Sequence, residues 1–253
     1  MRLELDVKNV YKAYGDKEVL ADVSVHLNRG EIVCVLGVSG VGKTTLFHIA
    51  SGLNLPDSGS VELRGEEITG RPGRVSYMLQ KDLLLPYKTV GENVAMPLIL
   101  KGVKKKEALA KVSPLFHEFG IEETQKLYPH ALSGGMRQRA ALLRTYVASD
   151  GIALLDEPFS ALDTITKGKI HRWFLDIMDK IDLSVLFITH DIDEAILLSD
   201  RIYILEGAPG RITEEIEIGV PKPRDKDFDL TDTFLSYKRK IVSALATNQG
   251  SGI

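Results

Sequence analysis

The sequence GVSGVGKTT occupies residues 37–45 and directly follows the apolar run Ile32–Leu36. An uninterrupted apolar run is typical of a strand that is covered on both faces, and the residues from Gly42 to Ser51 have the pattern of a helix. Between strand and helix, the pattern G-x-x-x-x-G-K-[ST] is present without a mismatch. Glycines let successive backbone N–H groups converge on phosphate oxygens, and a helix N-terminus attracts the same charge. The stretch therefore predicts a loop that binds the phosphates of a nucleoside triphosphate.

The polar side chains of this loop have separate expected roles. Lys43 supplies a positive charge for the outer phosphates, and the hydroxyl of Thr44 is placed to bind Mg²⁺. The residues expected to contact the nucleotide in this loop are Gly37, Ser39, Gly40, Val41, Gly42, Lys43, Thr44 and Thr45.

Strands and helices alternate along most of the chain. The predicted strands include Leu3–Val7, Val23–Leu27, Ile32–Leu36, Val75–Leu79, Ile152–Asp156, Val185–Thr189 and Arg201–Leu205. The predicted helices are Gly42–Ser51, Gly134–Ala148, Thr164–Ile181 and Ile192–Ser199, with a helical pattern between Leu83 and Leu132. With the phosphate loop, this alternation predicts the α/β fold of a P-loop NTPase core, with a mainly parallel sheet covered on both faces. The strands at the N-terminus are expected to be antiparallel.

The order of elements also predicts the domain organisation. The helical stretch from about residue 83 to residue 148 has the character of an inserted subdomain within one domain of residues 1–220. Residues 221–253 begin with a proline-rich, charged linker and continue into a pattern typical of a short C-terminal helix.

Polar side chains stand at the ends of three predicted strands. Asp156 ends one buried strand and Glu157 follows it, whereas Gln80 and His190 each come directly after another. Open α/β sheets bind ligands at the carboxyl ends of their strands. Asp156 is expected to organise Mg²⁺, and Glu157 to meet an attacking water from the other side of the strand end. Gln80 can reach either the metal or the water, and His190 is either structural or part of the site.

A second glycine pair stands in LSGG, residues 132–135. Ser133 is a good N-cap, and the N–H groups of Gly134 and Gly135 at the start of this helix form a second possible anion site. One triphosphate does not need two such sites from one domain. A second copy of the chain can supply the second site, whereas an ordinary helix cap is the simpler alternative for LSGG alone.

Composition excludes several classes of protein. The 253 residues are 44% hydrophobic and 26% charged, and the formal net charge of −3 lacks the basic excess of nucleic-acid-binding proteins. The single cysteine, Cys34, lies in an apolar run and is expected to be buried. The first ten residues lack the apolar core of a signal peptide, and no uncharged apolar run approaches the ~20 residues of a membrane span. We therefore expect a cytosolic protein, in which any membrane role requires another polypeptide.

Taken together, these motifs resemble those of the ATPase subunits of ATP-binding cassette (ABC) transporters. The resemblance rests on the phosphate loop, Gln80, LSGGMRQR, LLDEP, SALD (Ser160–Asp163) and His190, in that order. It implies a head-to-tail dimer with ATP between the phosphate loop of one copy and LSGG of the other. It also implies that Glu157 is the general base, that His190 contacts the γ-phosphate and that Asp163 signals across the dimer.

The adenine contact is also taken from the resemblance. It implies that Tyr14, in YKAYG, stacks on the adenine ring, and Tyr11 is the competing aromatic residue.

A narrower resemblance points to importers of the nitrate, sulfonate and taurine type, whose relatives handle thiamine or pyrimidine precursors. It rests on residues 78–98, LSGGMRQR, DEPFSALD and APGRI (Ala208–Ile212), whereas TYVASDG before the DEP motif departs from the usual pattern. Such a subunit implies an integral membrane permease, an extracellular or periplasmic substrate-binding protein as an indirect partner, and a place at the cytoplasmic face of the membrane. An exporter ATPase, a soluble ABC ATPase without a membrane partner and a non-catalytic nucleotide-binding scaffold are the alternatives.

The apolar run Leu83–Tyr87 follows Gln80 directly. It is either core of the inserted subdomain or a groove that receives a cytoplasmic helix of the permease. The resemblance implies that Gln80 senses the metal and transmits closure, so Gln80 must be connected to the part that is moved. This favours the groove, which is expected to include Leu84 and Leu85.

Overall fold

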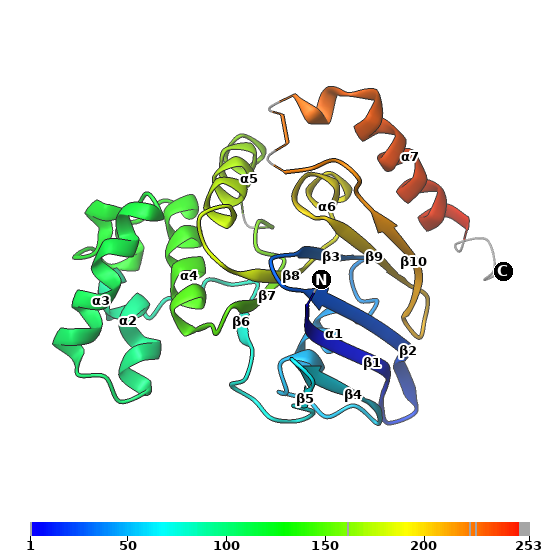
Figure 1. Ribbon diagram of the computed structural model, residues 1–253, viewed down its shortest axis with the longest axis horizontal. Helices are drawn as coiled ribbons and strands as arrows, with labels where there is room; N and C mark the ends of the chain where they lie inside the picture. The colour runs from blue at the N-terminus through cyan, green and yellow to red at the C-terminus, as the bar shows by residue number, and fades with distance from the viewer. Residues whose placement is uncertain (1, 161, 223, 226, 248–253) are drawn as a thin grey trace. The chain divides into compact units, whose positions relative to one another are not determined.

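The computed structural model describes residues 2–160, 162–222, 224–225 and 227–247, and the chain forms two compact units (Figure 1). The first unit consists of Met1–Val75 and Leu183–Ile253, and the second of Ser76–Asp182. Ala161 of the SALD motif, and residues 223, 226 and 248–253 of the predicted C-terminal segment, lie outside the described residues.

One sheet of the first unit is antiparallel and has the strand order β2-β1-β4-β5. Its strands are β1 (Leu3–Tyr14), β2 (Lys17–Asn28), β4 (Ser58–Leu63) and β5 (Glu66–Glu67). Leu5 and Val7 of β1 are buried, as expected from the alternation of apolar residues. Val10 is buried after one irregularity in the β1–β2 register, and Leu3 is exposed before another. The predicted antiparallel N-terminal strands are therefore confirmed.

The second sheet of this unit carries the phosphate loop. Strand β3 (Ile32–Leu36) pairs in parallel with β8 (Ser184–Thr189) on one side and with β9 (Arg201–Glu206) on the other. Every residue of these three strands is buried. Strand β3 is apolar throughout, as expected of a strand that is covered on both faces, whereas β8 and β9 have polar residues at their ends. Cys34 in β3 is buried too, as predicted, and burial raises the pKa of its thiol well above the usual value.

The remaining elements of the first unit follow these strands. They are α1 (Lys43–Ala50), α6 (Ile192–Leu198), β10 (Arg211–Glu217), the 3₁₀ helix η3 (Phe228–Leu230) and α7 (Asp232–Thr247). The predicted short C-terminal helix is α7, which at 16 residues is longer than expected and packs against α6 (Figure 1).

The second unit joins two strands to a group of helices. Strands β6 (Ser76–Met78) and β7 (Ile152–Asp156) pair in parallel. The helices are α2 (Val90–Leu100), α3 (Lys105–Glu118), η1 (Glu122–Thr124), η2 (Pro129–Ala131), α4 (Gly134–Ala148) and α5 (Thr164–Met178). Helix α2 packs against both α3 and α4, so these three helices form one packed group. The α/β fold is confirmed, with parallel pairing among β3, β8 and β9 and between β6 and β7, and with antiparallel pairing in the N-terminal sheet.

The predicted helical pattern from Leu83 onward begins too early. Residues 83–87 are not helical, and the first helix, α2, begins at Val90 after the N-cap Thr89. The hydroxyl of Thr89 accepts the N–H of Glu92, and the carboxylate of Glu92 accepts the N–H of Thr89. This capping box fixes the start of the helix. Its sequence, TVGE, predicts a helix that begins after Thr89, whereas the hydrophobic pattern alone does not locate the start.

The charge of Glu92 contributes to this cap. Hydrogen bonds from the side chain of Lys105 and from the N–H of Thr89 lower the pKa of Glu92 to about 2. Because this value lies below the ~4.3 of an unfolded chain, the ionised carboxylate stabilises the fold above that pH. The contribution is lost as the pH falls toward the folded-state pKa.

We predict that Thr89→Ala lowers the free energy of unfolding by about 1 kcal/mol at pH 7. Glu92→Gln is also expected to destabilise the protein at pH 7, and its difference from the wild type is expected to shrink as the pH falls from about 5 to about 3. Urea unfolding followed by circular dichroism measures both effects.

The matched control is Glu107→Gln on α3, because Glu107 forms an exposed pair with Lys111 one turn along the helix. Such a surface pair contributes only a few tenths of a kcal/mol, so this variant should behave like the wild type. A Glu92→Gln difference that stays constant across the pH range contradicts the role given to the Glu92 charge.

Candidate functional site

The loop Gly37–Gly42 connects β3 to α1, which is the strand–loop–helix context that the sequence predicts. A Cβ atom at Gly37 would lie 2.5 Å from the carbonyl oxygen of Leu205, and one at Gly42 would lie 2.7 Å from a methyl carbon of Leu20. Gly42 also has a φ of 112°, which side chains rarely allow. The loop can therefore follow this path only with glycine at both positions.

Lys43 is the first residue of α1 and is only 5% exposed. Its ammonium group donates hydrogen bonds to the carbonyl oxygens of Gly37 and Val38, at 2.8 and 2.9 Å. The positive charge therefore lies against the loop itself. No side chain caps the N-terminus of α1, and the neighbouring Thr44 is exposed. The loop thus offers backbone N–H groups, an ammonium group and a hydroxyl to an anion.

His190 lies close to this loop within the first unit. In the parallel pairing of β3 with β8, Leu36 is aligned with Thr189, and the N–H of Gly37 donates to the carbonyl of Thr189 at 3.3 Å. His190, the next residue, is exposed. The adjacent α6 is capped by Asp191, which fixes the chain after His190. The structure therefore brings the histidine to the edge where the phosphate loop begins.

Tyr14 and Tyr11 are both exposed, at 51% and 41%, so exposure alone does not choose between them. The hydroxyl of Tyr14 accepts a hydrogen bond from the amide of Asn54 at 3.0 Å, and the ammonium of Lys12 lies 5.3 Å from the centre of the Tyr14 ring. Asn54 follows α1, so Tyr14 is connected to the segment that carries the loop's helix.

In the second unit, the two acids at the end of β7 have different partners. Asp156 is 5% exposed and accepts a hydrogen bond from the Tyr77 hydroxyl at 3.0 Å. Glu157 accepts one from the side-chain amide of Gln80 at 3.1 Å. The structure thus brings Gln80 to Glu157.

The backbone of Glu157 adopts an unusual conformation. Its φ is 44°, in the left-handed region that non-glycine residues rarely occupy. Both the N–H and the hydroxyl of Ser160 donate to the Glu157 carbonyl, at 3.2 and 3.0 Å. Strained backbone that the surroundings hold in place is typical of functional sites.

Helix α4 begins at the LSGG motif. Ser133 is its N-cap, and the Ser133 hydroxyl accepts the N–H of Met136 at 3.3 Å, as predicted from the serine. Gly134 and Gly135 form the first turn. Asp163 caps α5 in the same way, accepting the N–H of Thr166 at 3.0 Å.

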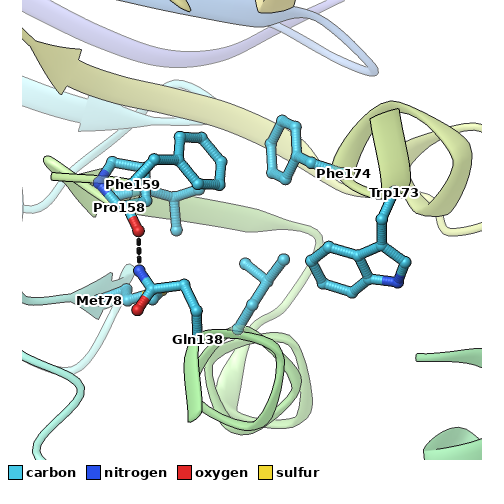
Figure 2. A pocket seen from close by; sticks show the side chains of 8 residues that line it. Met78, Gln138, Pro158, Phe159, Trp173 and Phe174 are labelled. Atoms are coloured by element: carbon cyan, nitrogen blue, oxygen red, sulfur yellow. Dashed lines mark hydrogen bonds between the residues drawn. The ribbon is translucent and has the colours of Figure 1, made fainter. Parts of the chain in front are cut away.

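The same α4 is connected to the loop after Glu157. The side-chain amide of Gln138 donates to the carbonyl of Pro158, beside a small pocket in the second unit (Figure 2). The pocket is lined by Met78, Gln138, Leu142, Leu155, Pro158, Phe159, Trp173 and Phe174. No ionisable side chain lines it, so it has none of the chemistry expected of the functional site.

The apolar run after Gln80 is divided between core and surface. Leu84 is buried, which corrects its assignment to an exposed groove. Leu83 and Tyr87 are 52% and 72% exposed. The guanidinium of Arg144 on α4 donates to the carbonyl oxygens of Asp82 and Leu83, which holds the start of this run. Leu83 and Tyr87, rather than Leu84, are therefore available to a partner.

Tyr77 is the side chain next to Asp156 that the sequence analysis gave no role. A signal for it existed, because Tyr77 stands in a predicted strand three residues before Gln80.

No helix within the described ranges combines the length and the apolar character needed to cross a membrane.

Comparison with known proteins identifies the family. Residues 20–160 match the family model described as ABC transporter. The formylaminopyrimidine import ATP-binding protein ThiZ of Halalkalibacterium halodurans is 42% identical over 215 residues, covering 85% of this chain and 84% of that protein. The nitrate import ATP-binding protein NrtD of Synechocystis is 35% identical over 253 residues, covering 97% of this chain and 95% of that protein.

A solved structure agrees with these relatives. The dimeric structure of MJ0796, a bacterial ABC transporter cassette, is 28% identical, with a TM-score of 0.73, and the similarity covers 86% of this chain and 100% of that one. The chain therefore belongs to the ABC transporter family, as an ATP-binding and ATP-hydrolysing protein.

Proposed function

We propose that this chain hydrolyses ATP to drive a membrane importer of a small anionic solute or of a thiamine or pyrimidine precursor. The observation that carries the proposal is the loop between β3 and α1, with glycines that no other residue can replace and with Lys43 against it. The similar import proteins for formylaminopyrimidine and nitrate support the direction of transport and the class of solute.

The nucleotide contacts are assigned to the loop and to Tyr14. The backbone of Gly37–Thr45 and the ammonium of Lys43 bind the phosphates. The exposed ring of Tyr14 stacks on the adenine, and its hydrogen bond from Asn54 supports that position.

Magnesium bound with ATP is assigned to Thr44, Gln80 and Asp156. Their hydroxyl, amide and carboxylate oxygens are the hard ligands that Mg²⁺ prefers. Among the described residues, no group of three or more His, Cys, Asp and Glu side chains forms a complete metal site. That agrees with an ion held by one carboxylate and the nucleotide phosphates, and the bound ion would neutralise charge on those phosphates.

Hydrolysis is assigned to Glu157 and His190. The carboxylate of Glu157 takes the proton from the attacking water, and Gln80, which donates to that carboxylate, orients it. His190, at the edge where the phosphate loop begins, contacts the γ-phosphate.

The proposed working form is a head-to-tail dimer of two copies. Ser133, Gly134 and Gly135 at the start of α4 bind the ATP held by the phosphate loop of the other copy, and Asp163 signals between them. The dimeric ABC cassette at 28% identity supports a working form of two copies.

The proposed membrane partner is an integral permease, with a substrate-binding protein outside the membrane as an indirect partner. In this proposal Leu83 and Tyr87 contact the permease at the cytoplasmic face of the membrane, and their exposure supports such a contact. Their neighbour Gln80 connects this contact to Glu157.

We predict that Glu157→Gln lowers the ATP turnover rate by about 10²- to 10⁴-fold, because it removes a general base while keeping the size of the side chain. ATP binding should remain. Steady-state phosphate release measures turnover, and equilibrium binding of a fluorescent ATP analogue measures affinity.

The matched control is Glu118→Gln at the exposed end of α3, which should hydrolyse ATP like the wild type. Hydrolysis near the wild-type rate by Glu157→Gln removes Glu157 from the role of base.

A second prediction concerns adenine recognition. Tyr14→Ala is expected to weaken ATP binding about fivefold, since an aromatic stack contributes about 1 kcal/mol. Tyr14→Trp and Tyr14→Phe keep an aromatic ring and should bind nearly normally. Isothermal titration with ATP measures these affinities, and Tyr11→Ala is the paired control. A larger loss in Tyr11→Ala than in Tyr14→Ala shows that Tyr11 makes the stack.

A further inference from the structure

Tyr77 lies beside the carboxylate to which the proposed function assigns magnesium. Its hydroxyl donates to the Oδ2 atom of Asp156 at 3.0 Å, from the strand next to the one that Asp156 ends. Tyr77 is half-buried and Asp156 is buried, so water competes weakly for this bond.

The strand pairing explains why this tyrosine reaches this acid. In the parallel pair of β6 and β7, Tyr77 is aligned with Leu154 and Met78 with Leu155. Side chains alternate along a strand, so Asp156, two residues after Leu154, is on the same face as Tyr77. The phenol extends along that face to the end of β7. The Asp156 carboxylate is thus held by a residue of the neighbouring strand, and no loop has to close to form this contact.

The same short segment also serves the second acid. Gln80 follows β6 and donates to Oε2 of Glu157 at 3.1 Å. Residues 76–80 therefore supply one donor to each of the two consecutive carboxylates.

The chemistry of the pair fixes the direction of the bond. Tyr77 donates through its phenol hydroxyl, and an ionised carboxylate such as that of Asp156 only accepts. A hydrogen bond to an ionised acceptor is shorter and stronger than one between neutral groups, so it restricts how the carboxylate can turn.

We propose that Tyr77 is a positioning residue, whose hydroxyl holds the Asp156 carboxylate in the orientation that binds magnesium with ATP. The proposal rests on the magnesium role of Asp156 in the proposed function. Groups that orient a ligating carboxylate contribute about 10- to 100-fold to metal affinity, although they do not touch the metal.

The test is Tyr77→Phe in the Glu157→Gln background, in which ATP should not be consumed. Equilibrium binding of a fluorescent ATP analogue is measured over a series of magnesium concentrations and again with a chelator. Tyr77→Phe is expected to raise the magnesium concentration for half-maximal effect about tenfold and to leave the chelator affinity unchanged.

Unfolding of the variant cannot produce this result. The affinities for the ATP analogue with magnesium and with the chelator are measured on the same sample, and unfolding would lower both of them. The matched control is Tyr146→Phe on α4, in the same unit, where the ring packs against Phe119. This variant removes a tyrosine hydroxyl elsewhere and should keep the wild-type dependence on magnesium.

Asp156→Asn separates the proposal from the function on which it rests. If Asp156→Asn raises the magnesium requirement and Tyr77→Phe does not, the proposal for Tyr77 is overturned and the role of Asp156 stands. If Asp156→Asn has no effect on that requirement, the assignment of magnesium to Asp156 is wrong and the proposal for Tyr77 fails with it. Equal losses of ATP affinity with magnesium and with the chelator assign Tyr77 a structural role only.

Discussion

The path of the backbone from β3 into α1 is the constraint on which the rest of the first unit depends. A side chain at Gly37 or Gly42 would collide with Leu205 or Leu20, so the loop exists only because these positions are glycine. Strand β3, fully buried between β8 and β9, fixes where the loop begins. Lys43 then follows at the start of α1, with its charge against the loop. A loop held this firmly can present its N–H groups to phosphate without first being ordered.

The second unit is organised around α4. The helix begins at Ser133, its Gln138 contacts the carbonyl of Pro158 just after Glu157, and its Arg144 holds the carbonyls of Asp82 and Leu83. One rigid helix thus connects the LSGG motif, the loop of the proposed base and the run that is proposed to contact the permease. If residues 83–87 are displaced, the two hydrogen bonds from the Arg144 guanidinium to the carbonyls of Asp82 and Leu83 can transmit the movement to α4.

Much of this could be predicted from the sequence where the local pattern has one physical solution. The bounds of β3, α4 and β7 agree with prediction, because a continuous apolar run or a serine cap before an amphipathic segment leaves little freedom. Strand β10 was missed, since Ile216 is its only buried residue and no alternation is visible.

Side-chain partners were harder to predict than elements. Leu84 and Leu83 are adjacent and equally apolar, yet one is buried and the other exposed, because residues 83–87 have no regular period. The bond from Tyr77 to Asp156 joins residues 79 positions apart and depends on the register of β6 with β7. The strand ends still gave Asp156, Glu157 and Gln80 as candidates, because the rule for open α/β sheets depends on topology and not on register.

In the proposed dimer, ATP binds between the phosphate loop of one copy and the LSGG helix of the other. The decisive experiment mixes Lys43→Ala with Ser133→Arg, each of which is inactive alone. A mixed dimer then has one site with both lesions and one site with neither. With free exchange of subunits, the mixture is expected to recover about a quarter of the wild-type ATPase activity, since half of the dimers are mixed and each has one intact site.

The control is each variant alone, carried through the same exchange procedure at the same total concentration, and it should stay inactive. Crosslinking confirms exchange, and circular dichroism with ATP binding confirms that Ser133→Arg is folded. A covalently linked dimer with one Glu157→Gln site shows whether a single site can turn over. Recovery of activity on mixing is the expected result. If the linked dimer hydrolyses ATP and no mixing ratio recovers activity, then Lys43 and Ser133 act within one chain and the head-to-tail dimer is wrong.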